Sequence, residues 1–198
     1  VHECLHEDGV WMFEQSYLPT MLDMNSYDTV CHEHLEYYAL RQIVWMAERV
    51  GLRLIHASLN EINGGSIAIT AVKAGSSRKA ESPGLATLLA EEDALQLDGN
   101  GIYDAFRKRI DAHRTELLAL LDKLNGEGRT VLGYGASTKG NTILQYCGLG
   151  PERLPAIAEV NADKFGCFTP GSGIPIVSES RARSMKPDFF LVLPWHFR

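Results

Sequence analysis

The second half of the chain takes its architecture from one run of residues, Thr130-Val131-Leu132-Gly133-Tyr134-Gly135-Ala136-Ser137-Thr138-Lys139-Gly140-Asn141-Thr142. An apolar β-type segment leads directly into glycines and then into a helical segment, which we expect at 138–146. Glycines let the backbone turn sharply, and the start of a helix presents N–H groups and the positive end of a dipole. The run therefore predicts a strand, a loop that binds an anion such as phosphate, and a helix.

Side chains of the loop support an anion site, because Ser137, Thr138 and Lys139 add hydroxyl and ammonium donors. The run is not a Walker A loop, since Lys139 precedes its glycine. It is also not a dinucleotide fingerprint, because the third glycine follows the second by five positions. Two alternatives stay open: glycines that only shape a tight turn, and a nicotinamide site in which Glu159 holds a ribose hydroxyl. We take the following as candidate substrate-binding residues of the loop: Gly133, Gly135, Ser137, Thr138, Lys139 and Asn141.

Strand and helix patterns alternate in the rest of this half. Apolar β-type segments at 156–160, 174–177 and 189–193 enclose a short helical segment near Arg181. Such β-α-β alternation predicts a parallel sheet with right-handed crossovers, so that 103–198 is expected to be a Rossmann-like domain.

A long amphipathic helix is expected at the start of that domain, from Tyr103 to Leu124. His113 falls on its apolar stripe. We expect His113 to be a core-edge histidine with a satisfied ring nitrogen.

The first 75 residues predict a different unit. A buried strand that reaches a sheet edge is expected at 10–14, and a helix at 40–50 is followed by Gly51 as its C-terminal cap. Two β-rich runs between 52 and 72 predict a hairpin. Turn-forming clusters then indicate a linker at 76–102 and a domain boundary there.

Composition sets limits on the class of protein. The 198 residues are 45% apolar and 22% charged, which is typical of a globular protein with one or two cores. A formal net charge of -6 argues against nucleic-acid partners. No apolar run reaches the roughly 20 residues that span a bilayer, and no signal peptide is seen, so we expect no membrane partner and a cytoplasmic location. The start at Val1 rather than Met leads us to expect a fragment.

Four cysteines are expected to be free thiols, because no Cys-x-x-Cys spacing occurs. They are Cys4, Cys31, Cys147 and Cys167.

A second motif is Tyr27-Asp28-Thr29-Val30-Cys31-His32-Glu33-His34, followed by Tyr37-Tyr38. Free histidine titrates at a pH of about 6.5, so a small shift makes it a base at neutral pH, and a neighbouring carboxylate fixes its tautomer. A solvated turn is one alternative. A metal site is another, but a zinc site needs three or four ligands and the chain offers no others at familiar spacing, so we expect no metal here.

These motifs together resemble the sugar C-methyltransferases, which use S-adenosylmethionine and act on nucleotide-linked keto-deoxysugars. The resemblance runs through the whole chain in order. It rests on Glu14, 27–38, Asn63-Gly64-Gly65-Ser66, 133–142, Asn161-Ala162-Asp163-Lys164, Pro170-Gly171 and Trp195-His196-Phe197.

The resemblance implies a domain plan. In that family a zinc-binding domain precedes an S-adenosylmethionine-binding domain of Rossmann type, and a second Rossmann-like domain follows. Residues 1–75 then correspond to the C-terminal part of a class I methyltransferase domain, 76–102 to a linker and 103–198 to the C-terminal domain. By the same resemblance the zinc site and the methyl-donor loop lie upstream of Val1. We therefore expect this chain alone to be inactive and to bind the donor weakly.

The resemblance also implies roles. His34 is the base that removes the proton next to the ketone, Glu33 orients nearby groups, and His32 is a second candidate for proton handling. The glycine loop faces the pyrophosphate of a nucleotide-linked sugar. The family carries Tyr before its His-Glu-His, and here Cys31 stands at that position of the sugar pocket. An oxygen-methyltransferase, a nicotinamide-binding oxidoreductase domain and a pure binding module remain as alternatives.

Overall fold

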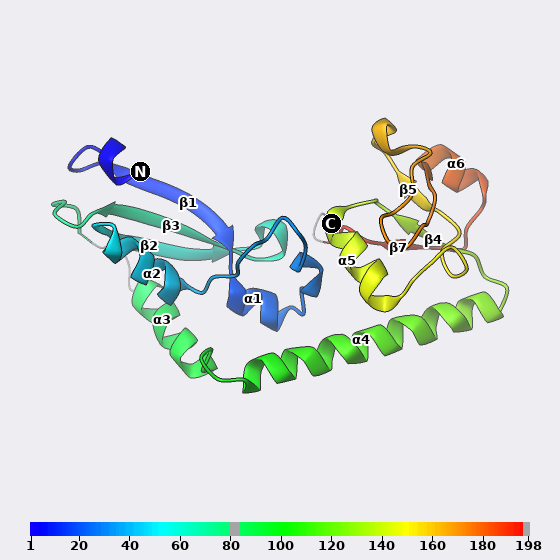
Figure 1. Cartoon of the computed structure of the whole chain (residues 1–198), viewed down its shortest axis with the longest axis horizontal. Coiled ribbons are helices and arrows are strands. Elements are labelled where there is room, and N and C mark those ends of the chain that lie inside the picture. The colour runs from blue at the N-terminus through cyan, green and yellow to red at the C-terminus, as the bar shows by residue number, and fades with distance from the viewer. Residues whose placement is uncertain (80–83, 196–198) are drawn as a thin grey trace. The chain divides into compact units, whose positions relative to one another are not determined.

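The computed structural model describes residues 1–79 and 84–195, which form two compact units (Figure 1). Unit 1 contains Val1–Ser26 and Leu35–Phe106, and unit 2 contains Tyr27–His34 and the chain from Arg107 onward. Part of the expected linker, 80–83, lies outside the described residues, as does the end of the Trp195-His196-Phe197 motif.

Unit 1 is built on an antiparallel sheet with strand order β1-β3-β2. Its strands are β1 (Val10–Ser16), β2 (Leu52–Asn60) and β3 (Ser66–Lys73), and its helices are α1 (Leu18–Asp23), α2 (Leu40–Arg49) and α3 (Gly84–Leu95). The predicted hairpin is confirmed, because β2 pairs with β3. The helix that ends before Gly51 is also confirmed, and Gly51 has the positive φ of 74° typical of a C-terminal cap.

Strand β1 differs from its prediction as a buried strand. It pairs only with β3 and forms the edge of the sheet, and the Met12 side chain is 74% exposed. An apolar run alone does not distinguish an edge strand from a central one, because that depends on how many neighbours the fold supplies.

Helix α3 lies within the segment expected as a linker. Leu88 is buried in the core of unit 1 together with Leu40 of α2 and Ile69 of β3. Glu92 is fully buried and accepts hydrogen bonds from the Leu40 and Arg41 N–H groups, at 2.5 and 3.0 Å. These are the first two N–H groups of α2, which lack partners within their own helix. Helix α3 is therefore a packed part of unit 1.

Unit 2 contains a four-stranded parallel sheet with strand order β6-β5-β4-β7, which confirms the predicted Rossmann-like domain. Its strands are β4 (Val131–Tyr134), β5 (Ile157–Glu159), β6 (Ile176–Ser178) and β7 (Phe189–Val192). Its helices are α5 (Thr138–Cys147) and α6 (Glu179–Ser184), and α4 (Gly101–Gly126) begins in unit 1 and ends in unit 2.

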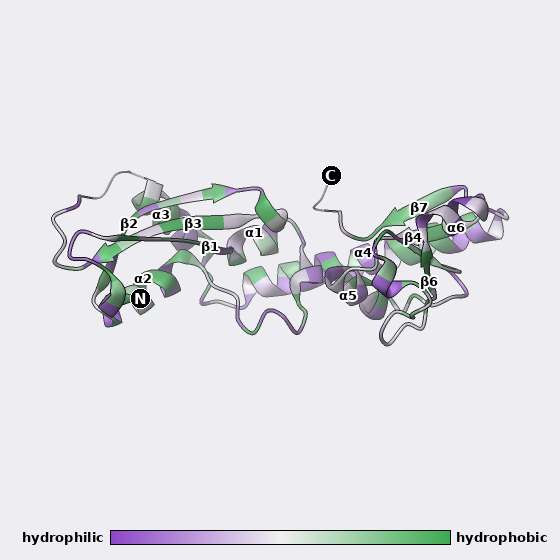
Figure 2. Cartoon of the chain, turned by 90° about the horizontal axis from the view of Figure 1, so that it is seen from above, coloured by the Kyte–Doolittle hydropathy of each residue, from purple (hydrophilic) through white to green (hydrophobic). Residues whose placement is uncertain are grey.

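Helices cover both faces of this sheet. Leu121 of α4 and Leu144 of α5 belong to one buried cluster, and Ala182 of α6 belongs to another on the strands. Figure 2 shows apolar residues gathered on the strands, whereas α4 carries hydrophilic and hydrophobic residues in alternation. The strand order reverses at β4, because β5 and β6 follow on one side and β7 returns to the other. Ligands of such folds bind beyond the carboxyl end of the strand at this reversal, which is where α5 begins.

Two further expectations concern the chain as a whole. All four cysteines are free thiols, as predicted. Within the described parts of the chain, no helix is both long and apolar enough to cross a membrane.

Candidate active site

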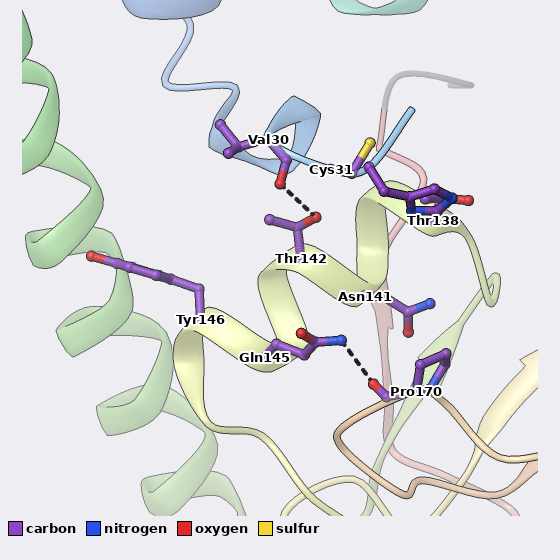
Figure 3. Close-up of a pocket in the computed structure, with 9 residues that line it drawn as sticks. Val30, Cys31, Thr138, Asn141, Thr142, Gln145, Tyr146 and Pro170 are labelled. Atoms are coloured by element: carbon purple, nitrogen blue, oxygen red, sulfur yellow. Dashed lines mark hydrogen bonds between the residues drawn. The ribbon is translucent and has the colours of Figure 1, made fainter. Parts of the chain in front are cut away.

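The segment Tyr27–His34, called the His-Glu-His segment below, lies against helix α5 inside unit 2 (Figure 3). The Thr138 hydroxyl donates a hydrogen bond to the Glu33 carboxylate at 3.1 Å. One helical turn further on, the Thr142 hydroxyl donates to the Val30 carbonyl at 3.4 Å. The tertiary structure thus joins the two motifs that the sequence presents more than a hundred residues apart.

A pocket of about 780 Å³ opens between them. Four residues predicted from the sequence line it: Cys31 and His32 from the segment, and Thr138 and Asn141 from α5. The remaining lining residues are Val30, Thr142, Gln145, Tyr146 and Pro170. Its size falls within the range of small-ligand sites, about 300 to 1,000 Å³.

The α5 residues of the pocket form one helical face. Thr138, Asn141, Thr142, Gln145 and Tyr146 are spaced by three and four residues, which places them together. The opposite face carries Leu144 and Cys147, both buried in the core. Thr142 ends the run that the sequence pointed to without being named as a candidate itself, and Gln145 and Tyr146 lie beyond that run and were not predicted. Their polar spacing at one face was the signal that could have found them.

Two of these residues are held in place by their neighbours. The Gln145 amide donates to the Pro170 carbonyl at 2.9 Å, as Figure 3 shows. The Tyr146 hydroxyl donates to the Asp111 carboxylate at 2.5 Å. This hydrogen bond raises the pKa of Tyr146, and burial and the negative charge of Asp111 add to the effect. The phenol therefore stays protonated at neutral pH.

Of the predicted loop at 133–142, only Thr138, Asn141 and Thr142 line the pocket, and its glycine part at 133–137, called the glycine loop below, does not. A Cβ atom at Gly133 would lie 2.8 Å from Cγ1 of Ile157. Gly135 has a φ of 83°, and a Cβ atom there would lie 2.6 Å from the Pro194 ring. Close packing against Ile157 and Pro194 is therefore enough to explain why glycine stands at both positions. Ser137 is the N-cap of α5, where its hydroxyl accepts from the Gly140 N–H at 3.0 Å.

Glu159 stabilises the same loop by hydrogen bonds to its backbone and to the residues that follow β5. Its carboxylate accepts from the N–H groups of Ala136, Val160 and Asn161, at 2.9, 2.7 and 3.0 Å. Burial would raise the pKa of Glu159, but these donors and the Lys164 ammonium lower it below its usual value. The oxygens of the ionised Glu159 carboxylate therefore already accept hydrogen bonds from three backbone N–H groups. This leaves the nicotinamide alternative without a free acidic group at that position.

The other predicted residues lie next to the pocket. The His34 N–H donates to the Cys31 carbonyl at 3.1 Å, which closes the turn that carries His32 and Glu33. His32 and Glu33 are exposed, whereas His34 and Lys139 are half-buried. Lys139 is the second residue of α5. In residues 1–79 and 84–195, no three His, Cys, Asp or Glu side chains come together as a metal site.

Fold and site together define a Rossmann-like α/β domain with a small-molecule pocket beside the helix that follows its central strand. Residues 61–198 match the family model described as the C-methyltransferase C-terminal domain, so the chain belongs to the C-methyltransferase family. The resemblance to C-methyltransferases that the sequence indicated is thereby confirmed.

A curated relative agrees with this assignment. The chain is 34% identical, over 197 residues, to C-methyltransferase NovU of Streptomyces niveus. All of this chain is covered, but it spans only 47% of that protein, about half its length.

Proposed function

We propose that the chain is the C-terminal part of an enzyme that methylates a carbon next to the keto group of a nucleotide-linked deoxysugar. The observation that carries this proposal is the shared pocket, in which Cys31 and His32 face Thr138 and Asn141 while Glu33 is bonded to Thr138. Candidate acid–base groups and candidate phosphate-binding groups are thus neighbours in one unit. Residues 1–75, apart from the His-Glu-His segment that lies in unit 2, are proposed to belong to the methyltransferase domain, and 103–198 to form the substrate-binding domain together with that segment.

Methylation at such a carbon requires a carbanion, so a base must remove the proton next to the ketone. His34 is proposed as this base, Glu33 as the group that orients its surroundings, and His32 as a contact for the enolate. S-Adenosylmethionine supplies the electrophilic methyl group that the carbanion takes. No residue of this chain is assigned to binding that donor.

The start of α5 is proposed to bind the pyrophosphate of the substrate. The helix dipole favours negative charge there, and Thr138, Lys139 and Asn141 add donors from its first turn. The glycine loop contributes by shaping this helix start, because the Gly135 and Ala136 N–H groups are already bonded, at 2.8 and 2.9 Å. Cys31 replaces a bulkier phenol of the family and is proposed to shape the sugar end of the pocket.

The test uses the full-length enzyme, S-adenosylmethionine with a deuterated methyl group, and a thymidine-diphosphate keto-deoxysugar. Mass spectrometry and carbon NMR of the product should place the label on the carbon next to the ketone. A methyl ether would favour the oxygen-methyltransferase alternative. Failure to methylate keto-deoxysugars, with intact folding and donor binding, would overturn the proposed substrate class.

A further inference from the structure

Tyr27 is buried where the His-Glu-His segment meets helices α4 and α5. Its side chain is 5% exposed, and its hydroxyl lies 3.0 Å from Nδ1 of His113 and 3.6 Å from Sγ of Cys147. His113 is on α4 and Cys147 is on α5. The prediction that His113 is a core-edge histidine with a satisfied ring nitrogen is confirmed. One hydroxyl therefore ties the beginning of the segment to two helices.

The Tyr27 ring also contacts a wall of the pocket. Its centroid lies 5.3 Å from that of Tyr146, which lines the pocket, and 5.7 Å from that of His113 in an edge-on arrangement. Such aromatic contacts favour particular relative orientations of the rings. The ring of Tyr27 is thus held as well as its hydroxyl.

The next residue adds a second buried polar contact. Asp28 is 2% exposed and accepts a hydrogen bond from Nε1 of Trp195 at 3.0 Å. Buried polar groups are costly unless each has its partner, so this pair and the Tyr27 contacts together select one placement of the segment.

Consecutive turns connect this buried end to the candidate base. The Tyr27 carbonyl accepts from the Val30 N–H at 3.0 Å, and the Thr29 carbonyl accepts from the Cys31 N–H at 2.9 Å. The Cys31 carbonyl then accepts from the His34 N–H. The Thr138 and Thr142 hydroxyls hold the far end of the segment through two hydrogen bonds that are exposed and therefore contribute less. A continuous series of hydrogen-bonded turns thus links Tyr27 to His34.

We propose that Tyr27 is a positioning residue. Its contacts with His113 and Cys147 hold the His-Glu-His segment in place beside the pocket, and Tyr27 itself does not touch the substrate. Burial raises the pKa of both Tyr27 and Cys147, so the phenol and the thiol remain neutral donors and acceptors. The effect of this positioning on catalysis rests on the proposed function, whereas the placement of the segment by Tyr27 is independent of it.

The experiment follows the placement of the segment by the alkylation rate of Cys31, which belongs to the segment and lines the pocket. The full-length enzyme and its Tyr27→Phe variant are treated with iodoacetamide, and alkylation of each cysteine is followed by peptide mass spectrometry. Loss of the Tyr27 hydrogen bonds should favour opening of the segment, so Cys31 should react about fivefold faster. Cys4, which is exposed and belongs to unit 1, should react at an unchanged rate and so serves as the internal reference.

Tyr17→Phe is the matched control. Tyr17 is also buried, at 3% exposure, and its hydroxyl also has a buried partner, the Glu92 carboxylate at 2.7 Å, but it belongs to unit 1. This variant should leave the Cys31 rate unchanged. Equal acceleration in Tyr17→Phe would show general destabilisation and overturn the proposal.

His113→Phe gives an independent variant, and it decides the matter if Tyr27→Phe does not fold. It keeps an aromatic ring against Tyr27 and removes the nitrogen, so it should also accelerate Cys31. An unchanged Cys31 rate would overturn the proposal. Methyl transfer, measured on the same variants before alkylation, separates the positioning by Tyr27 from the catalytic role proposed for the segment. Faster Cys31 labelling with an unchanged kcat would support the positioning of the segment by Tyr27 and reject the catalytic role proposed for the segment.

Discussion

The Thr138 hydroxyl lies 3.1 Å from the Glu33 carboxylate, although 105 positions separate the two residues in the chain. A carboxylate beside the first turn of a helix is also favoured by the helix dipole. The His-Glu-His segment therefore depends for its placement on the same helix end that we propose binds the substrate pyrophosphate. In the proposed function, substrate binding and acid–base chemistry therefore share one structural element.

Replacing Thr138 by Val keeps the shape of the side chain and removes the hydroxyl. Glu33 then loses its partner, and we expect kcat/KM of the full-length enzyme to fall by roughly tenfold, since a hydrogen bond to a charged group is involved. Glu33→Gln is the matched comparison, because the amide oxygen can still accept from Thr138, and its effect should be smaller. Full activity of Thr138→Val would show that the contact has no catalytic consequence.

His34→Asn tests the proposed base. In the full-length enzyme we expect kcat to fall by roughly 10² to 10⁴, as is typical when a general base is removed, with little change in nucleotide-sugar affinity. Exchange of the substrate α-proton with deuterated water, followed by NMR, should be lost as well. His32→Asn should be less harmful. If His32→Asn instead abolishes the exchange and His34→Asn does not, the roles of the two histidines are reversed.

Lys139→Ala tests the binding of phosphate at the start of α5. We expect thymidine-diphosphate sugar to bind about tenfold more weakly, because a charge-assisted contact is lost. The dependence of binding on salt concentration should also decrease. Titration calorimetry at two salt concentrations measures both effects. Lys108→Ala removes the same charge from an exposed position of α4 and should change neither; an equal loss in both variants would mean that Lys139 acts only through net charge.

Glu92→Ala tests the docking of α3 in unit 1. It leaves the Tyr17 hydroxyl and the Leu40 and Arg41 N–H groups without their buried acceptor. We expect the free energy of unfolding to fall by about 3 kcal/mol, measured by urea denaturation. Glu91→Ala, at the exposed neighbouring position, should change it by less than about 0.5 kcal/mol. Similar stability of the two variants would contradict the role of Glu92 as an anchor.

Glu159→Gln tests the brace of the glycine loop through pH. The folded state lowers the pKa of Glu159 below its usual 4.5, so the folded state binds this proton less tightly than the unfolded state. The stabilisation is therefore complete above pH 4.5 and is lost as the pH falls through the lower, folded-state pKa. The Gln variant should be less stable at pH 7 and should lose less stability in acid. Parallel stability curves from pH 7 to pH 2 would refute this.

Local pattern in the sequence was sufficient for most elements of the fold. The strand and helix periodicities predicted the β2–β3 hairpin, helix α2 and the alternating elements of unit 2, because each depends on residues close together in the chain. His32, Thr138 and Asn141 were identified as candidates from their own motifs and Cys31 from the family resemblance, and all four line the pocket. Candidate residues can be found in this way because their side-chain chemistry and their immediate neighbours are visible in the sequence, whereas their roles stay predictions.

Contacts between distant residues were decided only in three dimensions. The sequence did not indicate that the His-Glu-His segment packs on α5, that Gln145 and Tyr146 complete the pocket, or that Glu92 caps α2 from 52 positions away. It also did not distinguish an edge strand from a buried one at β1. Periodicity reports which face of an element is apolar, but the partner of that face, and of each buried polar group, is selected by the packing of the whole unit.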